Sequence, residues 1–588
     1  MSHSLRLVML ASLAVFAGTT IAVRAEVKAV FSEKGLASLA EEGTEWLADG
    51  VPAVLSVTTE SRTRNDKGYD EEVFEAAPLD GVEPRFDAAK REALFAYPWG
   101  SIAVAYRPGA DRLGLAVTVS NRGERPIVDF RLRLLRLRFP EPAAGWDKPS
   151  RHVVRSLDCV AAVPAVCGGR RVVACLDTLF PPLAVGYGSP ENPERTIHAV
   201  ELGAGVPAAD PDAPRIPVLG LARVAPGEER TFEVSLRFAP ADKPLAEIIG
   251  DLHAGFRKAF PPLNDWPDRR PIGMLMLHSG GRSERNPRGW FKKPELDIAT
   301  PEGKAEFRTL LMDYAARAVA SLKAFDAQGG IVWNIEGEEN PHPITYIGDP
   351  RLLPILAPEM DAVADEFFKQ FTDAGLKVGV TIRPTQVYFD EGKKAWSHGT
   401  GSHMPERNPL SEDYGALAVE GLPPWCFFPS AERLCRKIEY AKKRWGCTIF
   451  YIDTNGVYCP QGPKAAFEWM LLNGCVLRRV KERHPDVLLI PELNRDSLAS
   501  HDTNWAYGAQ YMELDLNGYG TPPGIRQLYP NAFSLVNIAD GPIEEKRDVL
   551  VQAVRNGDIL MARGWFADGR NAIVKSIYEE AAATPPAP

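Results

Sequence analysis

Two carboxylates in this sequence each end an apolar run and precede a polar turn. Asp453 closes the run that begins at Ile449, and Glu492 closes the run that begins at Leu488. Adjacent strands of a sheet lie about 4.8 Å apart, so carboxylates at matching heights on neighbouring strands can approach to roughly 5–5.5 Å. At that separation one carboxylate can attack an anomeric carbon while the other donates and then removes a proton. The pair therefore predicts cleavage of a glycosidic bond.

A purely structural interpretation of the two carboxylates is also open. Asp453 can cap the turn at Asn455-Gly456, and Glu492 can pair with Arg383 or Arg495. The distance between the two carboxyl groups in the folded protein distinguishes these alternatives, because a catalytic pair must lie close together.

Polar side chains also end nearly every other predicted strand of the C-terminal part. Carboxylates that crowd together repel one another, and folding alone does not favour that arrangement. Aromatic rings in loops beside such a rim can stack on the apolar face of a sugar. We therefore expect substrate contacts from these residues: His278, Glu336, Arg383, Trp396, Glu513, Asp515, Asp540, Arg563 and Trp565. Trp290 is a further loop tryptophan that we predict on this face.

Strands and helices alternate in the region that positions these residues. Eight apolar runs separated by helical patterns predict a (β/α)8 TIM barrel over residues 270–580, whose active site lies at the carboxyl ends of the strands. No GxGxxG or Walker sequence follows a strand, which argues against a nucleotide-binding sheet. The predicted strands are Ile272–His278, Gly330–Glu336, Lys377–Arg383, Thr448–Asp453, Val487–Glu492, Ala509–Asp515, Phe533–Asp540 and Asp558–Trp565.

The N-terminal part has a different periodicity. Phe130-Arg-Leu-Arg-Leu134 alternates strictly between apolar and charged residues, as a strand with one buried face does. Such runs, with many Pro and Gly turns between them, predict an antiparallel β-sandwich over residues 26–240. We expect a linker helix within 241–269 and a disordered tail over 581–588.

The first 25 residues have the pattern of a secretory signal peptide. Arg6 precedes the apolar run Leu7–Phe16, and Val23-Arg24-Ala25 is a small-residue cleavage site. The apolar run is shorter than the roughly 20 residues that span a bilayer. We expect export to the periplasm or the medium, with cleavage after Ala25 and no stable membrane insertion.

Composition limits the partners. Lys and Arg number 68 against 77 Asp and Glu, so the net charge is −9, which disfavours nucleic acid. The spacing of the 8 cysteines matches no CxxC pair or zinc ribbon. We therefore expect a carbohydrate partner and neither a metal site nor a cofactor.

The order of these features resembles known glycoside hydrolases. An export signal, a β-sandwich and a barrel with Phe-Tyr-Ile-Asp453 and Pro-Glu492 are similar to retaining α-glycosidases of the endo-α-N-acetylgalactosaminidase type and, more distantly, of the α-amylase superfamily. The resemblance implies Asp453 as nucleophile and Glu492 as acid/base, with Arg383 and Asp540 as partners of the carboxylate and of sugar hydroxyls. Tyr451 stands where the α-amylase pattern has an arginine.

Two alternatives accompany this assignment. The α-galactosidase group also has an Asp nucleophile on strand four, but its acid comes from strand six, here Glu513 or Asp515. A non-catalytic carbohydrate-binding protein on the same scaffold is the second alternative, because fold does not imply function. A metal-dependent barrel hydrolase fits less well, since the first strand does not end in HxH.

Overall fold

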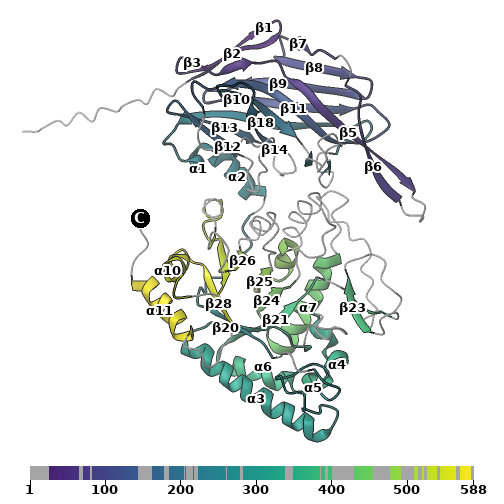
Figure 1. Ribbon diagram of the computed structural model, residues 1–588, viewed down its shortest axis with the longest axis vertical. Coiled ribbons are helices and arrows are strands. Elements are labelled where there is room, and N and C mark those ends of the chain that lie inside the picture. Colours follow the sequence, from purple (N-terminus) through teal and green to yellow (C-terminus); the bar gives the residue numbers. More distant parts are fainter. Residues whose placement is uncertain are drawn as a thin grey trace, which may run out of the picture.

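The computed structural model defines two parts of the chain, each built around its own sheets (Figure 1). The residues that it describes are 26–64, 70–79, 82–142, 162–177, 184–203, 205–206, 216–217, 223–259, 261–277, 282–337, 348–384, 386–390, 395–399, 429–453, 477–491, 509–513, 520–521, 526, 528–538, 543–563 and 570–583. The predicted signal peptide therefore lies outside the described residues.

Two antiparallel sheets form the N-terminal part. The larger follows the order β12-β13-β18-β10-β9-β8-β7, and the other the order β14-β15-β11-β5-β6, with β4 paired to β11. A smaller sheet joins β1 (Val27–Ser32), β2 (Gly35–Glu41) and β3 (Thr44–Glu45). The strands of the larger sheet are β7 (Arg85–Asp87), β8 (Glu92–Tyr97), β9 (Gly100–Pro108), β10 (Arg112–Asn121), β12 (Ala162–Cys167), β13 (Arg170–Leu176) and β18 (Glu229–Pro240). The second sheet consists of β4 (Leu47–Asp49), β5 (Ala53–Arg64), β6 (Asp70–Ala76), β11 (Ile127–Arg138), β14 (Ala184–Pro190) and β15 (Ile197–Gly203).

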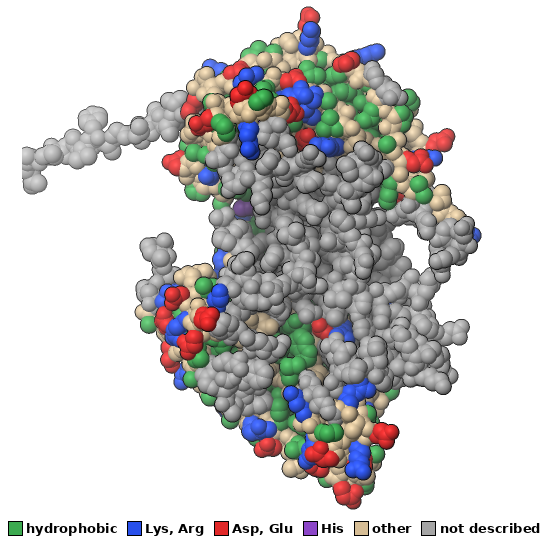
Figure 2. Space-filling model, in the orientation of Figure 1, with side chains coloured by type: hydrophobic (Ala, Val, Ile, Leu, Met, Phe, Trp, Pro, Cys, Tyr) green, Lys and Arg blue, Asp and Glu red, His purple; other side chains and the backbone are tan. Residues whose placement is uncertain are grey.

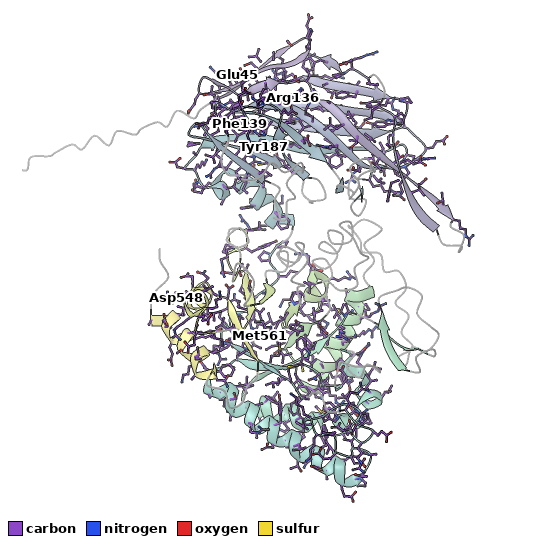
Figure 3. The ribbon with its side chains drawn as sticks, viewed as in Figure 1. Glu45, Arg136, Phe139, Tyr187, Asp548 and Met561 are labelled. Atoms are coloured by element: carbon purple, nitrogen blue, oxygen red, sulfur yellow. The ribbon has the colours of Figure 1, made fainter. Side chains whose placement is uncertain are left out.

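One apolar core joins these two sheets. Along β11, Phe130 and Leu132 are buried in it, whereas Arg131 between them is only partly buried, as period-two alternation requires. Phe139 and Tyr187 meet edge to face in the core, with ring centroids 6.0 Å apart (Figure 3). The predicted β-sandwich is confirmed.

Helices connect the sandwich to the second part. Both α1 (Leu245–Ile248) and α2 (Gly250–Ala259) lie along the lower edge of the sandwich (Figure 1). A small buried cluster unites Val173 of the sandwich and Phe256 of α2 with Tyr529. The rings of Phe256 and Tyr529 are 6.3 Å apart at their centroids. Apolar burial thus attaches the linker helix to both parts.

Eight parallel strands form the sheet of the C-terminal part. Their order is β25-β24-β21-β20-β19-β28-β27-β26, and the terminal strands β25 and β26 also lie against each other, so the sheet curls round into a barrel. Strands such as β24 are buried along their whole length, which is why their sequences are continuous apolar runs. The strands are β19 (Ile272–Leu275), β20 (Gly329–Val332), β21 (Lys377–Ile382), β24 (Ile449–Ile452), β25 (Leu488–Pro491), β26 (Ala509–Glu513), β27 (Phe533–Asn537) and β28 (Ile559–Arg563).

Helices pack on the outside of this sheet. The longest, α3 (Pro301–Ala324), begins where Thr300 accepts a hydrogen bond from the backbone N–H of Gly303, and it buries Phe307 and Leu311. The others include α4 (Leu353–Leu356), α5 (Pro358–Asp361), α6 (Ala364–Asp373), α7 (Pro429–Trp445), α10 (Arg547–Arg555) and α11 (Arg570–Ala583). None of the helices in the described part of the chain is long and apolar enough to cross a membrane.

The fold prediction is confirmed, and some element limits differ from it. The second barrel strand ends at Val332 and not at Glu336, because residues 333–337 form a turn. Helix α11 continues to Ala583, so residues 581–583 are helical where we expected the start of a disordered tail. A hairpin that the sequence reading missed, β22 (Gln386–Asp390) with β23 (Ala395–Gly399), stands between β21 and α7. On the face shown in Figure 2, acidic and basic side chains of the described residues are interspersed.

Candidate active site

Arg383 and Asp453 meet at the carboxyl ends of two neighbouring strands. Each follows directly on its strand, and the pairing of Ile382 with Ile452 brings them to the same height. Arg383 contacts Oδ2 of Asp453 through Nε at 2.7 Å and through Nη2 at 2.6 Å. The two residues are only 1% and 4% exposed, so the ion pair is held in a largely water-free setting.

Glu336 lies in the turn after β20. The Asn334 side chain accepts the N–H of Leu277 at 3.1 Å, and the Asn334 carbonyl accepts the N–H of Gly337 at 3.1 Å, which closes the turn. Glu336 is fully buried, and its Oε1 accepts the backbone N–H of Asp349 at 2.8 Å. Its other oxygen, Oε2, is buried and has no hydrogen-bond partner among the described residues.

Burial determines the protonation of Glu336. Removal from water raises the pKa of Glu336 to about 7, and hydrogen bonds from its own N–H and that of Asp349 offset only part of this effect. The negative charge of Asp349 raises the pKa further, and Lys437 lowers it. Glu336 is therefore a carboxyl group that can hold or release a proton near neutral pH.

A set of buried charges surrounds Asp349, behind Glu336. Burial raises the pKa of the Asp349 carboxyl, but the charge of Lys437 and the hydrogen bond from Arg351 outweigh it, so the pKa is lowered. Arg351 donates to Asp349 through Nε and Nη2, both at 2.8 Å. The Nζ of Lys437 is 3.6 Å from Oδ2 of Asp349. This aspartate is thus a paired anion.

Gly348 allows the segment before Asp349 to approach Arg383. Its φ of 70° is in the left-handed region, and a Cβ at this position would lie 2.8 Å from the backbone nitrogen of Arg383. The N–H of Arg383 donates to the Gly348 carbonyl at 3.0 Å. Gly348 and the end of β21 are therefore in close backbone contact.

An aromatic pair lies at the strand ends beside the ion pair. Trp333 follows β20, and Tyr451 is two residues before Asp453 on β24. Their ring centroids are 4.4 Å apart, with an interplanar angle of 56°. Tyr451 occupies the position at which the sequence departs from the α-amylase pattern, and here it packs on Trp333.

The structure thus describes three of the predicted site residues with their side chains: Glu336, Arg383 and Asp453. For three more it gives the backbone only. Trp396 lies in β23 opposite Phe389, Glu513 ends β26, and Arg563 ends β28. The remaining predicted site residues lie outside the described residues: His278, Glu492, Asp515, Asp540 and Trp565.

Trp290, one of the loop tryptophans predicted on the active face, is part of the core. Trp290 is 0% exposed, and its Nε1 donates to Oε1 of Glu359 at 2.6 Å, so the ring belongs to the barrel core. Glu359 is buried and also binds Arg288, which makes it the anchor of the segment after β19. Local sequence alone could not separate a loop tryptophan from one that a glutamate of another element draws inward.

Sequence reasoning missed two residues of the site, Asp349 and Lys437. Asp349 directly precedes the turn at Pro350, in a segment for which the sequence analysis predicts no strand or helix. Lys437 lies three residues after Leu434 and four before Ala441, two buried positions of α7, so it interrupts the buried stripe of the helix. That interruption is a signal that could have identified it.

Within the described residues, no group of three or more His, Cys, Asp or Glu side chains is arranged to hold a metal ion. The side chains of the site are instead carboxylates, guanidinium groups and one ammonium group. Such groups can orient a sugar by hydrogen bonds, carry a proton and stabilise charge.

Several solved structures resemble this chain over most of its length. An alpha-N-acetylgalactosaminidase from Bifidobacterium bifidum is 12% identical, with a TM-score of 0.44, over 95% of this chain and 92% of that one. A GH36 alpha-galactosidase from Geobacillus stearothermophilus is 10% identical, with a TM-score of 0.40, over 95% of this chain and 75% of that one. An alpha-galactosidase from Lactobacillus brevis is 11% identical, with a TM-score of 0.40, over 95% of this chain and 72% of that one.

The resemblance to TIM-barrel glycoside hydrolases that the sequence suggests is thus found among solved structures as well. No protein-family model matches the sequence, and a search of curated proteins finds no match. Function is therefore inferred below from the residues of this chain.

Proposed function

We propose that this chain is an exported glycoside hydrolase that acts with retention of anomeric configuration. The observation that carries the proposal is the buried Arg383–Asp453 ion pair, with Oδ2 of Asp453 held at 2.6–2.7 Å, at the carboxyl end of the barrel strands. Active sites of this fold lie at that end. The substrate that we propose is an oligosaccharide, polysaccharide or glycoconjugate.

Asp453 acts as the nucleophile in this proposal. Two guanidinium donors fix one of its oxygens, which orients the carboxylate for attack on an anomeric carbon. The attack forms a glycosyl-enzyme ester as the glycosidic bond breaks, and water then hydrolyses the ester. Two displacements at the same carbon retain its configuration.

Glu492 acts as the acid and base. The pairing of Ile452 with Pro491 supports this assignment, because these residues directly precede Asp453 and Glu492. Glu492 would protonate the departing oxygen and then take a proton from the attacking water. A strand-six acid, Glu513 or Asp515, is the competing assignment, and Glu513 is the last residue of β26.

The other predicted rim residues are proposed to bind sugar hydroxyls and ring faces. Glu336 supports this role, because its buried Oε2 has no hydrogen-bond partner among the described residues and a sugar hydroxyl could satisfy it. The other proposed contacts are His278, Trp396, Asp540, Arg563 and Trp565.

A panel of p-nitrophenyl α- and β-glycosides, including galactosides and N-acetylgalactosaminides, tests the proposal. With a cleaved substrate, Asp453→Asn should reduce kcat by about 1,000-fold or more, because it removes the nucleophile. Asp313→Asn is the matched control, since Asp313 is exposed on α3 and pairs with Arg317 four residues away. Unchanged turnover in Asp453→Asn would contradict the assignment of Asp453 as the nucleophile. Sugar binding without hydrolysis of any glycoside would favour the non-catalytic binding protein.

Leaving-group dependence identifies the acid. Glu492→Gln should reduce the rate of hydrolysis most for substrates with poor leaving groups and least for activated aryl glycosides, because only a poor leaving group needs protonation. The same behaviour in Glu513→Gln or Asp515→Asn, and not in Glu492→Gln, would move the acid to strand six. NMR of the first-formed product should show the anomer of the substrate.

Export has its own test. N-terminal sequencing of the secreted or periplasmic protein should begin at or near Glu26, after removal of the signal peptide. Protein recovered from these compartments with Met1 intact would contradict cleavage.

A further inference from the structure

Two cationic side chains of α7 lie at the end of β21. Arg433 and Lys437 are four residues apart, so they project from the same face of the helix. Nζ of Lys437 donates to the backbone carbonyl of Arg383 at 2.8 Å, and Nη1 of Arg433 reaches the carbonyl of Pro384 at 3.5 Å. The helix therefore holds the main chain of the residue that binds Asp453.

The same ammonium group also faces Asp349, in the segment between β20 and α4. Nζ of Lys437 is 3.6 Å from Oδ2 of Asp349, and the N–H of Asp349 donates to Glu336. Lys437 thus stands between the segment that bears Glu336 and the segment that bears Arg383. Its position links the end of β21 to the segment whose backbone donates to Glu336.

A lysine at this place is costly for the fold. Lys437 is 0% exposed, and burial lowers the pKa of its ammonium group to about 8 although Asp349 opposes the effect. A methionine of similar length would fill the same space without that cost. The cost is understandable if the ammonium group has a task that an apolar side chain cannot perform.

We propose that Lys437 is a positioning residue of the active site, which fixes Arg383, and through it Asp453, relative to Asp349 and Glu336. Its effect on catalysis rests on the function proposed above, whereas its effect on geometry does not. Removal of the ammonium group should leave the Arg383 carbonyl without its Lys437 donor and release the turn that follows β21. Displacement of a catalytic carboxylate by about 1 Å can cost about 100-fold in rate.

The charge of Lys437 also acts on the proton of Glu336. The charged groups that face the ammonium group are Asp349 and Arg351 before α4, Glu336 after β20 and Arg433 on α7. Since the Lys437 charge lowers the pKa of Glu336, a neutral side chain at 437 should raise that pKa further. Any limb of the pH–rate profile that Glu336 controls should move to higher pH.

The test compares Lys437→Met, Lys437→Arg and the control Lys442→Met. Lys442 lies on the same helix but pairs with Asp486 at the surface, so its loss should leave the site unchanged. On a cleaved aryl glycoside, Lys437→Met should lower kcat by about 10- to 100-fold with a smaller change in KM. Lys437→Arg should recover most of the loss, and the pH profile should shift only in Lys437→Met.

Crystal structures of the same variants separate this proposal from the proposed function. In Lys437→Met, Arg383 should move away from Asp453, whereas in Lys442→Met the contact should remain. An unmoved Arg383–Asp453 pair in Lys437→Met overturns the proposal, whether or not the enzyme cleaves a glycoside. Absence of hydrolysis by the wild type, with a displaced Arg383 in the variant, contradicts only the proposed function.

If Lys437→Met does not fold, the double variant Lys437→Met/Asp349→Asn removes both charges of this pair and keeps a side-chain oxygen that can accept a hydrogen bond from Arg351. A folded double variant with wild-type kcat and pH profile would overturn the proposal. A folded double variant with low kcat and a displaced Arg383 would support it.

Discussion

Two buried cations in this protein have opposite surroundings. Arg237, on β18, is 2% exposed, and each of its three guanidinium nitrogens donates a hydrogen bond. Nε binds Ser235 at 3.0 Å, Nη1 binds the carbonyl of Ile248 at 2.8 Å and also Asp251, and Nη2 binds Asp177 at 2.8 Å. We call these residues the Arg237 cluster.

The second set, here called the Lys437 cluster, consists of Lys437, Asp349, Glu336, Arg383 and Asp453. It contains one buried oxygen, Oε2 of Glu336, that no described residue satisfies. It also contains a carboxyl with a pKa of about 7 and an ammonium group with a pKa of about 8. Its protonation therefore changes within the range in which enzymes operate.

The comparison of the two clusters shows how hydrogen bonding fixes the protonation state of buried groups. Burial raises the pKa of Asp251, but hydrogen bonds from Arg237 and Arg112 outweigh it and lower the pKa to about 2. The stability that Asp251 contributes is present above pH 3.8 and is lost only as the pH falls towards about 2. A fully satisfied cluster thus keeps one protonation state and joins α1 and α2 to the sandwich. An incompletely satisfied cluster retains a proton that it can exchange.

The largest effect on stability is expected from Arg237→Met. Loss of the guanidinium group removes four hydrogen bonds, to Ser235, to the Ile248 carbonyl and to two aspartates, so the free energy of unfolding should fall by about 4 kcal/mol in urea denaturation. Arg107→Met is the control, because Arg107 forms an exposed pair with Glu233 and its loss should cost under about 1 kcal/mol. A loss in Arg237→Met no larger than that of the control would contradict a structural role for the Arg237 cluster.

Next in size is the pH-dependent effect of Glu336→Gln. The folded pKa of about 7 lies above the ordinary glutamate pKa of 4.5, so Glu336 stabilises the fold most below pH 4.5 and loses that contribution as the pH rises through 7. The wild type should therefore lose up to about 3 kcal/mol relative to Glu336→Gln between these pH values. Urea denaturation at pH 4.5, 6 and 8 measures the difference. Glu366→Gln, at an exposed pair with Arg308, should show none, and a pH-independent difference in Glu336→Gln would refute the prediction.

A smaller effect is expected from Gly348→Ala. A side chain with φ of 70° is strained, and here its Cβ would also collide with Arg383, so the cost should be about 2 kcal/mol. Gly375→Ala separates the two causes, because Gly375 has φ of 77° and its Cβ would meet nothing within 4 Å. Only Gly348→Ala should also reduce kcat. Equal stability losses and equal rates in the two variants would show that the contact with Arg383 is unimportant.

The smallest effect is expected from Ser235→Ala. Ser235 accepts from Arg237 and donates to Asp177 at 3.0 Å, and its loss should cost about 1 kcal/mol without a change in kcat. Thermal unfolding measures it, with Ser120→Ala as the control, because the half-buried Ser120 donates to Glu229 at the surface. A destabilisation as large as that of Arg237→Met would mean that Ser235, and not the charge, holds the Arg237 cluster together.

The sequence by itself determined the architecture and placed Arg383 and Asp453 at strand ends, whereas Glu492, the predicted partner of Asp453, lies outside the described residues. Alternation in segments such as Phe130–Leu134 identified strands with one buried face, and apolar runs between helical patterns identified parallel strands. Because parallel strands of a barrel end at one rim, the placement of Arg383 and Asp453 after their strands was enough to bring them together. Periodicity reports which face of an element is buried, but it does not fix where a strand ends, and β20 ends four residues before Glu336.

Only the tertiary structure decided which polar side chains are buried and with whom. Glu336 lies in a turn beyond its strand, and Trp290 is drawn inward by Glu359. Lys437 reaches from α7 to the end of β21 and to Asp349. Each of these outcomes depends on atoms of different elements that come within about 3–4 Å of each other. The cost of burying a charge is compensated only by partners at such distances, and no local pattern in the chain specifies them.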